Sequence, residues 1–335
     1  SVSSAGDVNG DGLDDLIIGA SGADANGTSS GTSYVVFGKT GQEAVYLSSV
    51  QAGNGGFAII GDSEFDRSGY SVSSAGDVNG DGLDDLIVGA FGDQPNGSLS
   101  GAAYVVFGKE DGARVRLSEV KAGIGGLVIN GTSESDFTGI SVSSAGDVNG
   151  DGFDDLIVGA PGDLPFNSAS VSSSGASFVV FGGDFTGAAT QIGTTGADAL
   201  TGTSAVDILI GGTGNDTLTG NGGADVLRGG AGNDLFAVQD LDFAKVDGGN
   251  GIDTLRLDGT GLSLDLSEIA SPTLQDIERI DLNGGGNSLR LEPLEVLGLS
   301  DESNTLRVLG NASDAVTLVG NSWAKTGQVT DSEGT

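Results

Sequence analysis

One run of oxygen-bearing side chains occurs three times in this chain at a fixed spacing. The phrase SVSSAGDVNGDG, followed by Leu or Phe and then DDLI, begins at Ser1, Ser71 and Ser141. It places Asp, Asn, Asp, a backbone carbonyl and Asp at positions 1, 3, 5, 7 and 9 of a loop, with Gly at position 6 for a sharp turn. Oxygen ligands at this spacing are typical of calcium loops. The predicted ligands are Asp7, Asn9, Asp11, Leu13 and Asp15, then Asp77, Asn79, Asp81, Leu83 and Asp85, and finally Asp147, Asn149, Asp151, Phe153 and Asp155.

These loops depart from an EF-hand at position 12, which needs a bidentate Glu. Ile18, Val88 and Val158 stand there instead, within apolar runs. We therefore predict a calcium site in a loop between β-strands. Zinc and copper are disfavoured because the chain has no Cys and no His.

The alternative is that NGDG forms only a tight turn between two strands. Four acids within nine residues would then repel one another without a compensating ion, which favours the calcium site. The acid just before position 9 is expected to be solvated in each copy. These residues are Asp14, Asp84 and Asp154.

A second, shorter repeat of nine residues occupies the middle of the chain. Its units begin at residues 193, 202, 211, 220, 229 and 248. Each carries a large apolar residue at position 8, expected to point inward and to stack on its neighbours, and most have glycines at several earlier positions. Each also has Asp at position 6, which we predict to ligate calcium. These are Asp198, Asp207, Asp216, Asp225, Asp234 and Asp253.

The second unit is degenerate, because Thr203 and Ala205 replace glycines. The alternative interpretation of the series is a Gly-rich solenoid without metal, in which the stacked Asp side chains would repel each other. The units follow the GGxGxDxUx pattern. They resemble the calcium-binding β-roll of the repeats-in-toxin family of secreted bacterial proteins. The resemblance implies a parallel β-roll that folds on calcium after export.

Each long repeat is expected to form four short strands, as in a propeller blade. In the second copy these are Ser71–Ala75, Leu86–Ala90, Ala102–Gly108 and the end of Val115–Gly131. The DVNGDG loops and the Gly159-Ala160-Pro161 ending resemble the FG-GAP repeats of integrin α-subunit propellers. The fold class is therefore predicted to be all-β, a partial β-propeller of about three four-stranded blades followed by a parallel β-roll or solenoid.

The predicted domains are 1–185 for the blades, 193–258 for the β-roll and 259–335 for degenerate coils or a cap that contains Trp323. The third blade lacks the segment that would form its fourth strand. A closed ring needs more blades, so we expect the ring to continue upstream of residue 1. The alternative is that neighbouring chains complete the blades, which would permit self-assembly.

Composition narrows the function further. The formal charge of −34 disfavours nucleic acid and anionic membrane surfaces as partners. No apolar stretch approaches a membrane span. No nucleophile–base arrangement with His or Cys exists, and no cofactor other than calcium is indicated. We therefore predict a protein without catalytic residues, although a paired-carboxylate hydrolase remains an alternative.

These observations together predict an extracellular, calcium-stabilised adhesion or surface protein. The loops that differ between the blades would bind a glycan or protein ligand. These loops are Ser21–Gly31, Phe91–Gly101 and Pro161–Gly175. The alternatives are the non-catalytic portion of a secreted hydrolase, or a structural subunit of a surface layer or fibre.

Overall fold

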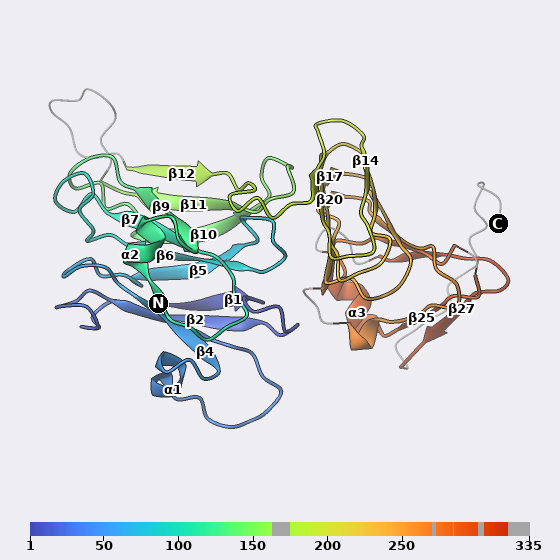
Figure 1. The fold of residues 1–335 in the computed structure, drawn as a ribbon, viewed down its shortest axis with the longest axis horizontal. Coiled ribbons are helices and arrows are strands. Elements are labelled where there is room, and N and C mark those ends of the chain that lie inside the picture. The colour runs from blue at the N-terminus through green and yellow to red at the C-terminus, as the bar shows by residue number, and fades with distance from the viewer. Residues whose placement is uncertain (163–174, 270–272, 284, 301–304, 321–335) are drawn as a thin grey trace. The chain divides into compact units, whose positions relative to one another are not determined.

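The computed structural model describes residues 1–162, 175–269, 273–283, 285–300 and 305–320 (Figure 1). Trp323 and most of the Pro161–Gly175 loop lie outside this range, so the predictions made for them stay predictions. Contacts divide the chain into two compact units, with the main boundary between Phe185 and Thr186. Within the described residues, no helix is long and apolar enough to cross a membrane.

The first unit consists of antiparallel sheets, one for each long repeat. The first sheet contains β1 (Val2–Gly6), β2 (Asp15–Ala20), β3 (Thr32–Val36) and β4 (Gly56–Ile60). The second contains β5 (Ser71–Gly76), β6 (Asp85–Ala90), β7 (Ala102–Val106) and β9 (Gly126–Asn130). The third contains β10 (Ser141–Gly146), β11 (Asp155–Ala160) and β12 (Ala176–Val180). The predicted four-stranded blade is confirmed in two copies, and the third copy has three strands in the described range, as its sequence indicated.

Two features of this unit were not predicted. Short helices precede the last strand of the first two blades, α1 (Leu47–Gln51) and α2 (Leu117–Lys121). In addition, β8 (Val115–Arg116) leaves the second repeat and pairs in parallel with β4 of the first blade. This strand exchange connects two neighbouring blades through backbone hydrogen bonds.

The middle blade is buried on both faces because its strands alternate between two cores. Leu86 and Val88 of β6 pack with residues of the first blade, whereas Ile87 between them packs against the third. The same period of two holds in β7, where Tyr104 faces the first blade and Val105 faces the third. The apolar runs of the sequence thus reflect burial on both faces of a blade.

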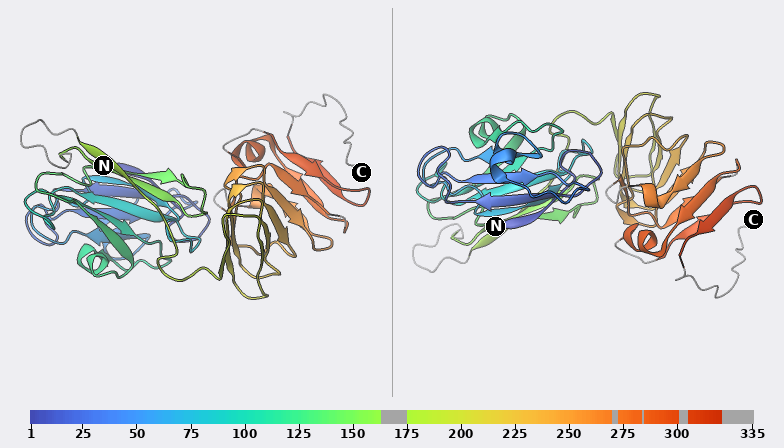
Figure 2. Two further views of the ribbon diagram at one scale, coloured as in Figure 1. Left: turned by 90° about the horizontal axis from the view of Figure 1, so that it is seen from above. Right: turned by 90° about the horizontal axis from the view of Figure 1, so that it is seen from below.

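The second unit is a coil of short parallel strands, as the nine-residue repeat predicts (Figure 2). One sheet contains β13 (Gln191–Ile192), β15 (Ile208–Thr213), β17 (Val226–Gly232), β19 (Lys245–Asp247) and β23 (Leu274–Gln275), with β20 (Asn250–Gly251) paired to β17. A second contains β14 (Ala199–Thr201), β16 (Thr217–Thr219), β18 (Leu235–Val238), β21 (Thr254–Leu257), β24 (Arg279–Asp281) and β26 (Arg307–Leu309). A third contains β22 (Ser263–Asp265), β25 (Ser288–Leu291) and β27 (Ala315–Leu318). A 3₁₀ turn at Leu266–Glu268 and helix α3 (Pro293–Gly298) complete the unit.

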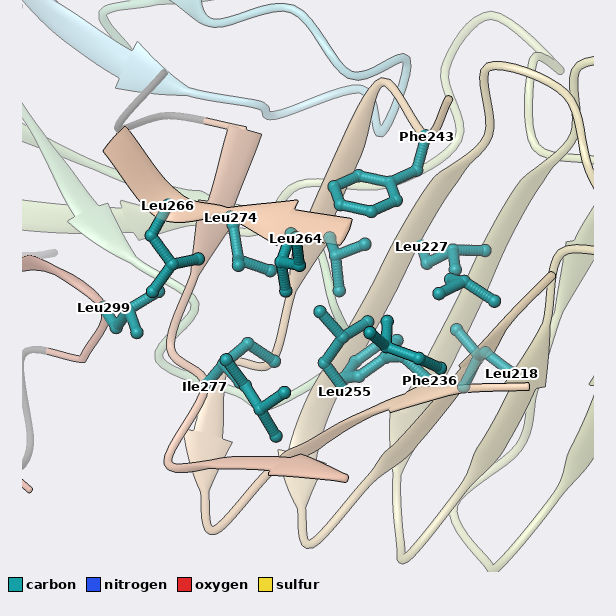
Figure 3. Close-up of a cluster of buried hydrophobic side chains, with 14 of the residues drawn as sticks. Leu218, Leu227, Phe236, Phe243, Leu255, Leu264, Leu266, Leu274, Ile277 and Leu299 are labelled. Atoms are coloured by element: carbon teal, nitrogen blue, oxygen red, sulfur yellow. The ribbon is translucent and has the colours of Figure 1, made fainter. Parts of the chain in front are cut away.

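The interior of this coil is a stack of apolar side chains. Figure 3 shows Leu218, Leu227, Phe236 and Leu255 among the residues of this core, and each is fully buried. All four stand at position 8 of a repeat unit, as predicted. The same core continues through Leu264, beyond the last repeat unit. The coil is therefore longer than the segment that carries the nine-residue motif.

Candidate metal centres

The repeated Asp residues of the coil form two ladders, one at each turn. Each unit of nine residues makes half a coil, so equivalent positions recur every two units. Asp198, Asp216, Asp234 and Asp253 precede β14, β16, β18 and β21, whereas Asp207 and Asp225 precede β15 and β17. The Asp side chains, which the sequence analysis expected to be stacked, therefore form two ladders with a step of one full coil.

Each ladder is held by the same hydrogen bond. The backbone N–H of one Asp donates to Oδ1 of the Asp in the next coil. The distances are 2.7 Å for Asp198 to Asp216, 2.9 Å for Asp207 to Asp225, 2.7 Å for Asp216 to Asp234 and 2.7 Å for Asp234 to Asp253. One carboxylate oxygen is thereby fixed in place, and the other is aimed into the turn.

That second oxygen has no hydrogen-bond partner in Asp216, Asp234 and Asp253, whose side chains are fully or almost fully buried. A buried carboxylate oxygen without a partner is costly, unless a cation compensates it. Next to each lies a glycine cradle. A Cβ on Gly229 would stand 2.4 Å from Asp234 Oδ2 and 2.5 Å from the carbonyl oxygen of Gly248. The carboxylate and carbonyl oxygens therefore converge on a space that only glycine leaves open.

The donors at these turns fit calcium. Within the described residues, no three Asp or Glu side chains gather closely enough to hold a metal by themselves. Each centre would therefore draw on backbone carbonyls and water as well as carboxylates, which calcium accepts. Asp216, Asp234 and Asp253 would each contribute to an ion site at its own coil, and the ions would supply the charge that compensates the buried oxygens.

The first two units of the repeat differ from the rest. In Asp198, Oδ2 already accepts hydrogen bonds from the backbone N–H and hydroxyl of Thr194, at 2.6 and 2.8 Å. In Asp207, Thr203 makes the same two bonds at 2.6 and 2.9 Å. In both units a Thr thus donates to the carboxylate oxygen that an ion would otherwise compensate. For Asp207 this agrees with the degenerate motif at Thr203. The metal role of these two residues stays a prediction.

Burial changes the acidity of the ladder. Desolvation raises the pKa of Asp234 to about 6 and, together with the charges of Asp234 and Glu278, that of Asp253 to about 8. The hydrogen bonds from Thr194 instead lower the pKa of Asp198. Asp253 therefore holds a proton near neutral pH in the absence of a cation, whereas Asp234 is largely ionised there.

This acidity predicts a specific pH dependence. The raised pKa of Asp253 means that its contribution to folding is present at low pH and is lost as pH rises through about 8. The calcium-free protein should therefore be more stable at mildly acidic than at alkaline pH. Calcium affinity should change in the opposite sense, since protons must leave, and rise by up to about tenfold per pH unit for each proton displaced. Calorimetric titrations in buffers of different ionisation enthalpy would measure the released protons, and a pH-independent affinity without proton release would contradict the prediction.

The three blade loops connect the first two strands of their sheets. In the first loop, Asp7 Oδ2 accepts from Gly12 N–H at 2.8 Å, and Asp7 Oδ1 accepts from Asp11 N–H at 3.1 Å. Asn9 Oδ1 also accepts from Asp11 N–H, at 3.0 Å. The third loop repeats this last bond between Asn149 and Asp151 at 2.9 Å. The side chains at positions 1 and 3 thus accept hydrogen bonds from the backbone of position 5. Their role as calcium ligands stays a prediction.

The acid at position 9 has a structural task in every copy. Asp15 accepts hydrogen bonds from the backbone N–H of Val8 at 3.0 Å and of Gly38 at 2.7 Å. Asp85 and Asp155 make the equivalent bonds to their own blades. Burial raises the pKa of Asp15 to about 7. This residue therefore joins the loop to the end of β3, in addition to its predicted role as a ligand.

The expectation that the acid before position 9 is solvated is wrong for two of the three copies. Asp84 Oδ2 accepts from the backbone N–H of Asp7 in the preceding blade at 2.7 Å, and Asp84 N–H donates to the carbonyl of Asp7 at 3.1 Å. Asp154 makes the same pair of bonds to Asp77, at 2.7 and 3.2 Å. Only Asp14, in the first blade, is exposed as expected. The repeated Asp-Asp doublet was the available signal, because one acid serves its own loop and the other its neighbour.

Comparison with known families agrees with this architecture. The FG-GAP repeat matches residues 1–36, 68–106 and 138–180. The RTX calcium-binding nonapeptide repeat matches residues 201–236. The chain therefore contains FG-GAP repeats followed by RTX calcium-binding repeats, as the resemblances implied, and calcium is the ion that these repeats indicate.

Similar curated proteins are integrin α-subunits. Integrin alpha pat-2 of Caenorhabditis briggsae is 34% identical over 163 residues, which is 46% of this chain and 12% of that protein. Integrin alpha-5 of Xenopus laevis is 35% identical over 161 residues, which is 48% of this chain and 14% of that protein. Human integrin alpha-6 is 39% identical over 97 residues, or 28% of this chain and 8% of that protein. The chain spans only a small part of these relatives.

Proposed function

We propose that this chain is an extracellular adhesion module whose folded state depends on calcium. The observation that carries the proposal is the ladder of Asp216, Asp234 and Asp253, each with a buried oxygen that has no hydrogen-bond partner and that a cation would satisfy. The matches to calcium-binding RTX repeats and to the FG-GAP repeats of integrins support it. Calcium is abundant outside cells and scarce in the cytosol, so the coil would fold after export, when binding energy becomes folding energy.

A ligand-binding surface on the blades is supported by an aromatic cluster. The ring of Tyr70 meets that of Phe91 edge-on at 4.6 Å, and Phe137 lies 6.4 Å from Phe91. The guanidinium of Arg67 stands over Phe91 at 5.7 Å. Tyr70 and the nearby Phe65 are about half exposed. Exposed aromatic rings with adjacent polar groups suit stacking on a glycan ring or a protein side chain.

The backbone around this cluster is strained. Phe65 and Arg67 both adopt left-handed conformations, with φ of 67° and 56°. Bulky residues are rarely held in this region, and such strain is concentrated at functional sites. The loop 62–70 therefore joins the variable loop Phe91–Gly101 as a candidate contact surface, although the sequence indicated only the latter.

Binding to surfaces tests this function. The calcium-loaded chain should bind a subset of glycans on an array, or fixed cells, and Tyr70→Ala should weaken that binding at least about tenfold through loss of the stacking surface. Tyr46→Ala is the matched control, because Tyr46 is exposed on the first blade but lies outside the cluster. Absence of binding by the wild-type chain, or equal losses in the two variants, would count against a ligand surface at this cluster.

A structural role in a surface assembly is the second candidate, and one observation favours it. Leu16 on the first blade is 49% exposed and Ile157 on the third is 38% exposed, whereas their equivalents in the middle blade are buried. These outer faces would pack on a further blade in the way that the three blades pack on each other. Light scattering in calcium would reveal the growth of assemblies with concentration if this role is the correct one.

A further inference from the structure

The acidic ladder extends one coil beyond the last repeat unit. The backbone N–H of Asp253 donates to Oε2 of Glu278 at 2.8 Å, as each earlier Asp donates to the next. We propose that the calcium site of Asp253, the last Asp of the ladder, is completed by the carbonyl of Asp276 and by Glu278, residues that carry no repeat signature. This inference rests on the proposed calcium-dependent function and adds two donors to it.

Strand register places Glu278 in the ladder. Thr254 of β21 pairs in parallel with Arg279 of β24, so Glu278 precedes its strand as Asp253 precedes the one before. Arg279 N–H donates to the carbonyl of Asp253 at 2.9 Å, which repeats the bond that Thr254 N–H makes to Asp234. Glu278 is 8% exposed. Its carboxylate is therefore held inside the turn by the same backbone pattern that holds the motif residues.

An unsatisfied oxygen points into this site. Asp253 is fully buried, and its Oδ2 has no hydrogen-bond partner. A Cβ on Gly248 would lie 2.8 Å from that oxygen and 1.8 Å from the carbonyl oxygen of Asp276. One coil earlier, a Cβ on Gly229 would meet Asp234 Oδ2 and the Gly248 carbonyl in the same way. The carbonyl of Asp276 thus takes the place that the carbonyl of the next unit's first glycine has in the repeats.

A shorter turn explains why the sequence hides this site. From Gly248 to Asp253 the turn runs over five positions, whereas from Asp276 to Glu278 it runs over two. Asp276 adopts a left-handed conformation, with φ of 49°, which bends the chain sharply without a glycine. We infer that the additional methylene of Glu allows its carboxylate to reach the place that Asp occupies in a full-length turn. A search for GGxGxDxUx passes over this segment, because spacing, glycines and acid have all changed.

The chemistry of the site suits calcium. Its donors are two carboxylates and a backbone carbonyl, and oxygen donors of this mixed kind are the ligands of calcium rather than of zinc. Two arginines of the adjoining coils pair elsewhere, Arg256 with Asp258 and Arg290 with Asp265. An ion here would join the last repeat to the coil that follows, and so extend calcium-dependent folding beyond residue 258.

Counting bound ions in the full chain tests the site. Glu278→Gln keeps an oxygen that can accept from Asp253 N–H but removes the charge, so the variant should bind one calcium ion fewer than wild type, or bind one ion at least about tenfold more weakly. Glu268→Gln is the matched control, because Glu268 is exposed in the same part of the coil. Calcium is measured by elemental analysis after gel filtration and by calorimetric titration. Equal stoichiometry and affinity in Glu278→Gln and wild type would overturn the site.

A measurement on the wild-type chain tests the site even if the variant does not fold. Hydrogen exchange of peptides that cover 273–283 should slow at the same calcium concentration as exchange of the peptides that cover Asp234 and Asp253. Unchanged exchange in 273–283, while the ladder peptides become protected, would refute the site without any substitution. If the wild-type chain binds no calcium at all, the proposed function fails first, so the two failures are distinguishable.

Discussion

Removal of calcium near neutral pH should unfold the coil that begins at residue 193. Asp216, Asp234 and Asp253 each carry a buried carboxylate oxygen without a partner, and they are stacked one coil apart. An uncompensated buried charge costs about 3–5 kcal/mol, and keeping a carboxyl protonated far above its usual pKa, as in Asp253, also costs free energy. The three residues together therefore cost on the order of 10 kcal/mol. A whole domain is stable by only about 5–15 kcal/mol. The cost of a ladder without ions is therefore large enough to remove the folded state.

Far-UV circular dichroism and light scattering during a calcium titration from a chelated start would measure this transition. We expect an expanded chain that becomes compact cooperatively, with hydrogen exchange assigning the largest gain of protection to 193–258. A compact chelated chain with a protected coil would contradict the prediction, and the turns would then be ordinary metal-free turns.

A neutralised ladder gives the matched control for this experiment. In the triple variant Asp216→Asn, Asp234→Asn and Asp253→Asn, each side chain keeps an oxygen for the ladder bond, and its amide can donate to the glycine carbonyl nearby. The variant should stay folded in chelator and lose its response to calcium in these coils. Unfolding of this variant under the same conditions would show that repulsion between charges is not the cause.

The second large effect is expected at a glycine whose surroundings differ between repeats. Gly76 and Gly146 share the same sequence context and similar left-handed backbones, with φ of 71° and 65°. A Cβ on Gly76 would lie 2.4 Å from Asp154 Oδ2, whereas a Cβ on Gly146 would meet nothing within 4 Å. Both alanine substitutions carry the backbone cost of about 1–2 kcal/mol. Only Gly76→Ala would also break the bond between Asp154 and Asp77 of the preceding blade, at a further cost of about 1–3 kcal/mol.

Denaturant unfolding in saturating calcium would measure this difference. Gly76→Ala should lose clearly more stability than Gly146→Ala, and Asp84→Ala should lose more than Asp14→Ala for the same reason. Equal losses within each pair would show that the contact between blades contributes nothing to stability.

The repeats by themselves determined the kind of fold. A loop with oxygen ligands followed by apolar runs predicted the blades, and Asp and a large apolar residue at fixed positions of nine predicted the coil. Both were correct because periodic patterns depend on local geometry, which each copy repeats. Later strands, such as Ser288–Leu291, continue the coil where the nine-residue motif has faded.

The tertiary structure decided what identical residues do. Leu16 and Leu86 occupy the same position of the same phrase, yet Leu16 is 49% exposed and Leu86 is fully buried, because only the second has a blade before it. Asp14 and Asp84 differ in the same way, one exposed and one bonded to a neighbour. Glu278 shows the reverse case, since a residue outside any motif takes a motif position through strand register. Sequence thus specifies each unit, but burial, partners and the end of a ladder depend on which unit lies beside it in space.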